Sequence, residues 1–185
     1  RSVSGFLGAS LAGVFIVAGP WFISTASVAA VQRLPFLAGG PEALAFTGAM
    51  VWAFALSIGL GTGPLYAYSR LTADLVYERR RGEAGTALLK SAAAFALASL
   101  AAGAALAPIL IGDRPHAFLF RASFAALLGA LGALWLAMMT VTVLRRFGRI
   151  LGAYAAGMGL LVFLAARWGP RYGAAGGIAA LAAGY

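Results

Sequence analysis

The chain contains no cysteine, one histidine and only five acidic residues among its 185 positions. Without cysteine it cannot form a disulfide scaffold, and with one histidine it offers almost nothing for a metal or acid–base centre. Charged residues make up 10% of the chain, whereas soluble proteins carry about 25%. This scarcity excludes a water-soluble globule, because too few polar side chains are present to cover its surface.

Long apolar stretches are what the sequence has in abundance. Apolar residues make up 62% of the chain, and the mean hydropathy is +0.91. Six stretches without a charged residue run for 31, 27, 22, 23, 17 and 14 residues, starting at positions 2, 43, 91, 122, 150 and 172. A helix needs about 20 apolar residues to cross a bilayer. The stretches are rich in Ala, Leu and Gly without regular alternation, which favours helices over barrel strands.

We therefore predict an all-α, polytopic membrane helix bundle that occupies residues 1–185 as one unit, with no catalytic or metal site and no cofactor. Helices are expected at about residues 5–31, 43–68, 86–111, 117–144, 150–166 and 172–185, the last of them cut short. The missing initiator methionine and the abrupt end favour a piece of a longer protein. The alternative is a half-sized protein that must dimerise.

The basic residues predict how these helices are oriented, because Lys and Arg stay on the cytoplasmic side of a membrane. Five basic residues lie in or near the first, third and fifth loops. Eight lie in the second and fourth loops, namely Arg70, Arg79, Arg80, Arg81, Lys90, Arg145, Arg146 and Arg149. The even loops and the N-terminus are therefore expected in the cytoplasm. The net charge of +9 then needs no nucleic acid as a partner, and it favours anionic lipid headgroups.

Two prolines, each preceded by glycine, interrupt predicted spans at Pro20 and Pro64. A proline removes one backbone hydrogen bond and kinks a helix, which a membrane protein tolerates beside other helices or a water-filled cavity. The residues after the first break, Trp21, Ser24 and Thr25, give that helix a semi-polar side suited to a wall that touches sugar or water. The two prolines are thus candidate hinges, with static kinks as the alternative.

Charged residues mark two further candidate positions. Arg70, Asp74 and Glu78 are spaced four residues apart, so a helix would place them on one face as a ladder of ion pairs. The alternative is a solvated helix end, where such pairs contribute little. Arg121 opens the fourth span, where it either lines a cavity or extends to the lipid headgroups.

Glycines, tryptophans and the placement of carboxylates complete the pattern. Gly59 with Gly63, and Gly173 with Gly177, form small-xxx-small pairs, which are typical of close helix packing in lipid. Trp52 and Trp135 either stack on a sugar face or anchor the chain at the membrane interface. No Asp or Glu lies inside a predicted span, which disfavours a cation-coupled antiporter whose coupling acid is in this part of the protein.

Several local motifs combine into a recognisable whole. They are Gly19-Pro20-Trp21 with Ser24, Ala55-Leu56-Ser57 with Gly63-Pro64, Ser69-Arg70 with Ala73-Asp74 and Tyr77-Glu78, Trp135 followed by Arg146 to Gly157, and Gly173-Ala174-Ala175-Gly176. With these motifs the sequence resembles the PelG family over nearly its whole length. Members of that family usually begin with a polar segment containing "GFELR" and continue past a sixth helix, and both features are missing here.

The resemblance implies a place in the multidrug/oligosaccharidyl-lipid/polysaccharide exporter superfamily. Its members have about twelve helices in two lobes around a central cavity, and this chain would be the first lobe. PelG-like proteins are thought to move a hexosamine-rich biofilm polysaccharide across the bacterial inner membrane. The implied partners are a cytoplasmic glycosyltransferase and membrane subunits that respond to cyclic di-GMP.

Our leading hypothesis from the sequence is an inner-membrane exporter subunit that forms part of a conduit wall for a nascent exopolysaccharide. The substrate path would include Pro20, Trp21, Ser24, Pro64, Arg70, Asp74 and Arg121. Partner docking would use Arg79, Arg80, Arg81, Arg145, Arg146 and Arg149. The alternatives are a lipid-linked oligosaccharide flippase or drug exporter of the same superfamily, and a scaffold that docks a polysaccharide synthase without transporting anything.

Overall fold

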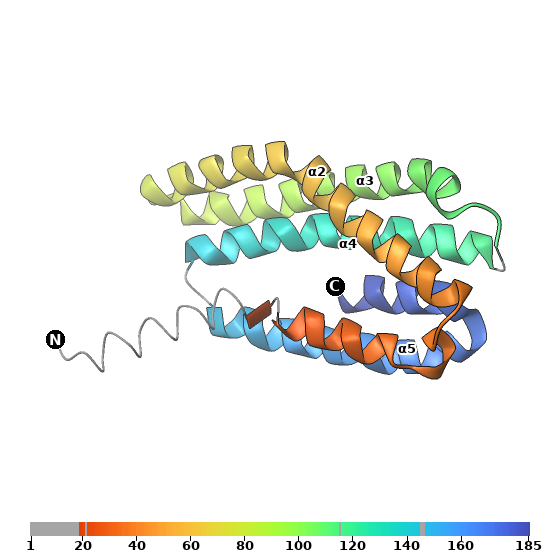
Figure 1. Ribbon diagram of the computed structural model, residues 1–185. Coiled ribbons are helices and arrows are strands. Elements are labelled where there is room, and N and C mark those ends of the chain that lie inside the picture. Colours follow the sequence, from red (N-terminus) through yellow and green to blue (C-terminus); the bar gives the residue numbers. More distant parts are fainter. Residues whose placement is uncertain (1–18, 21, 115, 145–146) are drawn as a thin grey trace, which may run out of the picture.

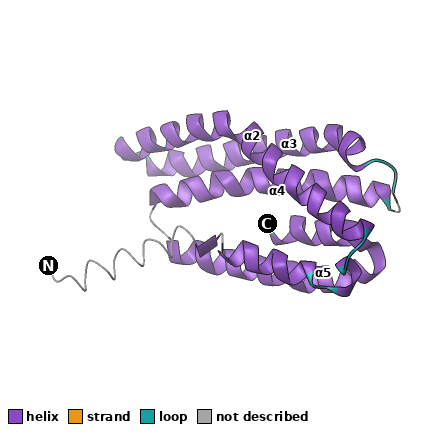
Figure 2. Cartoon of the chain, viewed as in Figure 1, coloured by secondary structure: helices purple, strands orange, loops and turns teal. Residues whose placement is uncertain are grey.

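The computed structural model describes residues 19–20, 22–114, 116–144 and 147–185, and this part of the chain is helical with short turns (Figures 1 and 2). A helical segment at Phe22–Gln32 leads to the 3-10 helix η1 at Pro35–Leu37. Four long helices follow: α2 at Pro41–Tyr77, α3 at Arg81–Ile111, α4 at Ala117–Leu144 and α5 at Phe147–Gly184. The all-helical fold class expected from the sequence is confirmed.

Four helices in the described part, α2 to α5, are long and apolar enough to cross a membrane. Six separate spans were expected, and that number is wrong for the described residues. The fifth and sixth predicted helices lie within α5, which is broken only at Gly173. We call residues 174–184, which follow the break, the arm of α5. Most of the first predicted helix lies outside the described residues.

Glycine and proline set the helix ends where the chain must turn. Gly39 and Gly40 have φ of 90° and 81°, and Pro41 then begins α2 with a backbone angle that suits a first helical turn. Gly112 follows the last residue of α3 and also has a positive φ, of 65°, which lets the chain leave the helix there. Pro64 lies inside α2, and the helix continues past it.

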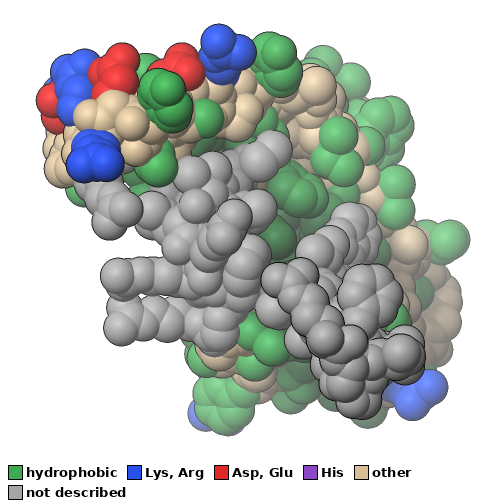
Figure 3. Space-filling model, turned by 90° about the vertical axis from the view of Figure 1, so that its left-hand side faces the viewer, with side chains coloured by type: hydrophobic (Ala, Val, Ile, Leu, Met, Phe, Trp, Pro, Cys, Tyr) green, Lys and Arg blue, Asp and Glu red, His purple; other side chains and the backbone are tan. Residues whose placement is uncertain are grey.

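The helices run back and forth between two ends of the bundle (Figure 1). The α2–α3 turn lies at one end, together with the end of α4 and the beginning of α5. The α3–α4 loop, the residues before α2 and the break in α5 lie at the other end. At the α2–α3 end, acidic and basic side chains gather at one edge of the face in Figure 3. We call residues 70–90 the charged tip.

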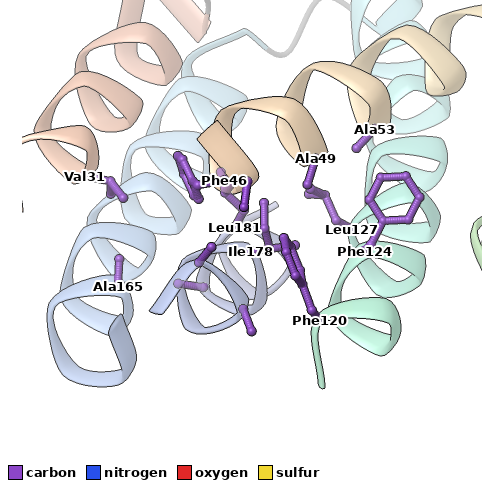
Figure 4. Packing of buried hydrophobic residues seen from close by; sticks show 14 of the residues in the cluster. Val31, Phe46, Ala49, Ala53, Phe120, Phe124, Leu127, Ala165, Ile178 and Leu181 are labelled. Carbon is purple, nitrogen blue, oxygen red and sulfur yellow. The ribbon is translucent and has the colours of Figure 1, made fainter. Parts of the chain in front are cut away.

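The buried core lies where α2, α4 and the arm of α5 after Gly173 meet (Figure 4). Phe46 of α2, Phe124 and Leu127 of α4, and Ile178 and Leu181 of the arm are fully buried. Between membrane helices this interface is stabilised mainly by close packing, since lipid tails are as apolar as the side chains. The arm is therefore held against the bundle along its length rather than attached only at the break.

Helix α3 packs most closely on α4, and glycines allow this. A Cβ added at Gly103 would lie 2.8 Å from the Cα of Ala125, and one added at Gly132 would lie 2.7 Å from Ser99 Oγ. Of the two packing pairs expected from the sequence, an added Cβ at Gly59 or Gly63 meets nothing within 4 Å, whereas one added at Gly177 would lie 2.9 Å from the Phe46 ring. The close approach of α3 to α4 is made by glycines outside both pairs.

Candidate functional site

A cavity of about 320 Å³ lies between the segment Phe22–Gln32 and helices α2, α4 and α5. Pro20, Ser24, Val28 and Gln32 recur every four residues, so one face of the first helical segment lines it. Thr25 and Ala29 also line the cavity, and both side chains are exposed on the surface formed by the described residues. The other lining residues are Met50, Phe54, Leu134, Trp135, Met138, Tyr154 and Tyr185.

Three hydroxyl groups from distant parts of the chain meet in this cavity. Ser24 Oγ lies 2.9 Å from Tyr154 OH and 2.5 Å from Tyr185 OH. Each hydroxyl can donate one hydrogen bond and accept two. Ser24 Oγ also donates to Met158 Sδ at 4.0 Å, so the two tyrosine hydroxyls donate to Ser24 and acceptor positions are left for a ligand. We call Ser24, Tyr154 and Tyr185 the hydroxyl cluster.

Aromatic rings surround the hydroxyl cluster in fixed orientations. The ring of Tyr185 makes edge-to-face contacts with Phe54, at 5.7 Å between centroids, and with Tyr154, at 6.1 Å. Trp135 donates its indole N–H to Ser57 Oγ at 3.1 Å, and Ser57 donates in turn to the carbonyl oxygen of Phe54 at 2.8 Å. Because the indole donor is satisfied by α2, the Trp135 ring is held in the cavity wall.

The arm after Gly173 brings Tyr185 into the cavity, and Glu42 fixes where that arm begins. Gly173 has φ of 56° and ψ of −136°, a conformation that favours glycine. The next residue, Ala174, donates its backbone N–H to Glu42 Oε2 at 2.5 Å. A carboxylate is well suited to a helix N-terminus, where backbone donors lack partners. This contact therefore ties the start of α2 to the arm.

The described residues that line the cavity are uncharged. Among the described residues, no Asp, Glu, Lys, Arg or His lines the cavity. No group of three or more His, Cys, Asp or Glu that could hold a metal ion occurs in the described part either. The walls present aromatic and apolar faces with a few hydroxyls and one amide, the pattern expected of a site that binds a neutral ligand with both apolar faces and hydroxyl groups.

The structure brings together only some of the residues predicted for a substrate path. Pro20 and Ser24 line the cavity, whereas Trp21 lies outside the described residues. Pro64 is exposed on α2 and does not line it. Trp135, for which sugar stacking was one option, is in the cavity wall, and Trp52 is half-exposed elsewhere on α2.

The charged residues predicted for the path are also away from the cavity. Arg70 pairs with Asp74 at 3.4 Å on the exposed surface of α2. Arg121 donates to the carbonyl oxygen of Gly112 at 2.8 Å and to Asp113 Oδ1 at 2.9 Å, so it holds the α3–α4 loop. These pairs support local structure, and nothing in their geometry joins them to the hydroxyl cluster.

The arginines predicted for docking lie partly in the charged tip. Arg80 bridges Glu78, at 2.9 Å, and Glu83, at 2.6 Å. The hydrogen bond to Arg80 lowers the pKa of Glu83, and the bonds to Glu83 and Glu78 raise the pKa of Arg80. Arg79 is exposed with φ of 62°. Of the rest, Arg81 begins α3, Arg149 is in the first turn of α5, and Arg145 and Arg146 lie outside the described residues.

Sequence reasoning missed Phe54, Tyr154 and Tyr185 as cavity residues. Each is a single aromatic residue in an apolar helix, where packing and interfacial anchoring are the usual roles. The only signal was indirect, since a hydroxyl in an apolar span needs a hydrogen-bond partner. That argument flags Ser24, Tyr154 and Tyr185 separately but does not pair residues 130 and 161 positions apart.

Comparisons with known proteins give one match. No curated protein and no solved structure matches the chain significantly. One family model, PelG, described as "Putative exopolysaccharide Exporter (EPS-E)", matches residues 1–185. That family is defined by transport, and its description agrees with a membrane protein whose described part has four span-length apolar helices and a neutral cavity between them. The chain belongs to the PelG family of exopolysaccharide exporters.

Proposed function

We propose that this chain forms part of the wall of a conduit that carries a nascent exopolysaccharide across the bacterial inner membrane. The single observation that carries this proposal is the cavity in which Ser24, Tyr154 and Tyr185 meet. In this role the cavity touches the passing glycan and the chain performs no chemistry on it. The family match supplies the substrate class.

The composition of the lining supports a glycan. A sugar ring has an apolar face of C–H groups and a rim of hydroxyls. Trp135, Phe54 and Met138 offer flat or adaptable apolar contacts, whereas the hydroxyl cluster offers acceptors and the Gln32 amide a donor for the rim. Hydrogen bonds between neutral groups are individually weak, about 1 kcal/mol each. Weak contacts suit a polymer that must keep moving past the site.

The same composition weighs against the other transport hypotheses for this part of the protein. A lipid-linked oligosaccharide carries phosphate groups, which call for Arg or Lys close by. A cationic drug calls for a carboxylate, because a charge without a partner is costly to bury. The described lining offers neither type of side chain. An uncharged polymer is the substrate that this cavity accommodates without such a cost.

We further propose that the charged tip faces the cytoplasm, with the N-terminus on the same side, and that it docks a glycosyltransferase and other synthase subunits. The positive-inside tendency supports this orientation, because the α2–α3 turn and the first turn of α5, which contains Arg149, lie at the same end of the bundle in Figure 1. Arg70, Arg80, Asp74, Glu78 and Glu83 are already engaged with one another. Docking through the tip would therefore depend on Arg79, Arg81 and the basic residues that begin α5.

The test of the conduit is secretion of polysaccharide from cells that carry the full-length protein with Tyr154→Phe and Tyr185→Phe together. Both rings remain, and only the hydroxyls are lost. We expect secretion per membrane-inserted protein to fall about thirtyfold, as two hydrogen bonds of about 1 kcal/mol each would suggest. Tyr66→Phe is the matched control, because Tyr66 is 75% exposed on α2 and does not line the cavity. Secretion unchanged in the double variant would contradict the proposal.

The scaffold hypothesis remains the second candidate because acidic and basic side chains gather in the charged tip. It predicts that replacing Arg79, Arg80 and Arg81 by Gln releases the glycosyltransferase from purified membranes. It also predicts that the Tyr154/Tyr185 double variant leaves secretion unaffected. Loss of secretion in the tyrosine variant with the glycosyltransferase still bound would reject a scaffold that only docks a synthase.

A further inference from the structure

A second hollow lies on a different face of α2, at the end of the bundle opposite the charged tip. Leu44, Gly48 and Trp52 recur every four residues and line it, whereas Met50 and Phe54 line the central cavity. Its volume is about 120 Å³, and its other walls come from the end of α3 and the beginning of α4. We call this hollow the α2–α3 groove.

Small residues of α2 create the α2–α3 groove. Its floor is made of buried side chains, including Ala45, Ala49 and Phe120. Its rim is exposed, since Leu44 is 77% accessible. A Cβ added at Gly48 meets nothing within 4 Å, so the space above this glycine is open. A larger side chain at position 48 would fill the groove rather than disturb the fold.

A single positive charge stands at the mouth of the groove. Arg114 lines it, is exposed, and donates its Nε–H to the carbonyl oxygen of Ile111 at 3.2 Å. That bond fixes the start of the guanidinium and leaves its terminal N–H groups for another partner. The neighbouring carboxylate, Asp113, is bound by Arg121 at 2.9 Å. Among the described residues, no ion pair involves Arg114.

The position of this charge matches the level of a lipid headgroup. The apolar span of α3 ends at Ile111, three residues before Arg114, so the guanidinium lies just past the end of a membrane-spanning segment. From Leu44 to Trp52 the groove follows α2 inward for about 12 Å at 1.5 Å per residue. An apolar channel that begins at a cation and runs into the membrane has the shape of one phospholipid acyl chain below its phosphate.

We propose that the α2–α3 groove binds one acyl chain of an anionic phospholipid, with Arg114 holding the headgroup phosphate. Guanidinium groups bind phosphate with two parallel hydrogen bonds. The site favours an anionic lipid over a zwitterionic one, because the ammonium group of a choline lipid offsets the attraction of its phosphate to Arg114. The small residues at positions 45, 48 and 49 admit the chain, and Trp52 and Phe120 flank it. This site is independent of the proposed conduit, because it shares no lining residue with the central cavity.

Native mass spectrometry of the purified full-length protein tests the site, with phosphatidylglycerol and phosphatidylcholine of identical chains added in turn. We expect the unaltered protein to retain phosphatidylglycerol about fivefold more, the ratio that one basic residue at an anionic lipid supplies. Arg114→Gln should remove the preference between lipids, and Gly48→Leu should lower the retention of both. The matched controls are Arg33→Gln, another exposed arginine at the same end, and Gly59→Leu, a glycine of α2 with open space outside the groove.

Equal retention of the two lipids by the unaltered protein would overturn the proposal. An equal loss of retention in Arg33→Gln and Arg114→Gln would also overturn it, because the preference would then be a general effect of charge. The unfolding midpoint of each variant in detergent is measured alongside. Gly48→Leu and Gly59→Leu present the same leucine on α2, so retention lost only in Gly48→Leu supports the groove.

Discussion

Replacing Gly173 with alanine should release the arm of α5 that carries Tyr185 into the cavity. The backbone there has φ of 56° and ψ of −136°, which an alanine adopts only under strain. The new Cβ would also collide with the Glu42 carboxylate, which accepts the hydrogen bond from Ala174 N–H. The variant therefore loses a backbone conformation and a contact that ties α2 to the arm.

The expected magnitude follows from these two losses. Backbone strain of this kind costs about 1–3 kcal/mol, and a lost hydrogen bond to a charged group about 1.5–3 kcal/mol. We expect the unfolding midpoint in detergent to fall by about 10 °C, as a loss of about 4 kcal/mol suggests for a chain of this size. The matched control is Gly159→Ala, since Gly159 is in the same helix and its added Cβ meets nothing within 4 Å.

The displacement of the arm can be read from a single thiol, because the chain has no cysteine of its own. Ala180 is fully buried on the arm, so Ala180→Cys should react slowly with a maleimide. Adding Gly173→Ala should make that thiol react much faster, whereas adding Gly159→Ala should not. If the thiol stays protected and the midpoint is unchanged in Gly173→Ala, the reasoning about the break is wrong.

Two further predictions concern the helix contacts and the charged tip. A Cβ at Gly132 would lie 2.7 Å from Ser99 Oγ, so a larger side chain there forces α3 and α4 to shift. Gly132→Val should therefore lower the free energy of unfolding in detergent by about 1–3 kcal/mol. Gly59→Val, where an added Cβ meets nothing within 4 Å, should have no such effect. Arg80→Gln should raise the pKa of Glu83, measured by carbon NMR of labelled glutamate, because the hydrogen bond from Arg80 is what lowers it. Since the folded pKa is depressed, the stabilisation from this pair is present above the unfolded pKa and is lost as pH falls through the folded pKa. An unmoved Glu83 titration in Arg80→Gln would contradict this origin of the shift.

The helical character of the chain was predictable because long stretches of it carry no charged residue. Removing a charged side chain from water into lipid is costly, so the uncharged stretches outline the apolar parts of α2, α3 and α4. The number of spans was not predictable in the same way. Charges at Arg167 and Arg171 suggested a loop, but the helix continues through Pro170 and breaks at Gly173. Several glycines are present in this region, and the sequence does not reveal which of them takes a positive φ.

The part of the candidate site on the first helical segment was accessible from the sequence, and the rest depends on long-range pairing. Pro20 and Ser24 were selected because hydroxyls at helical spacing after a proline break mark a polar face, and this face lines the cavity. Pro64 shares the same local motif yet is exposed, because a Gly-Pro pair does not reveal which side of a helix meets its neighbours. Tyr185 reaches Ser24 only through the reversal at Gly173, which no local pattern specifies.

The most direct test of the central claim is to trap the glycan in the cavity during synthesis. A photoreactive phenylalanine analogue replaces Tyr154, which lines the cavity, or Tyr66, which is exposed on α2, in cells that are producing the polymer. After illumination, we predict that polysaccharide is covalently attached to the protein with the probe at position 154 and not to that with the probe at position 66. Polysaccharide attached equally at both positions, or at neither, would contradict a glycan path through this cavity.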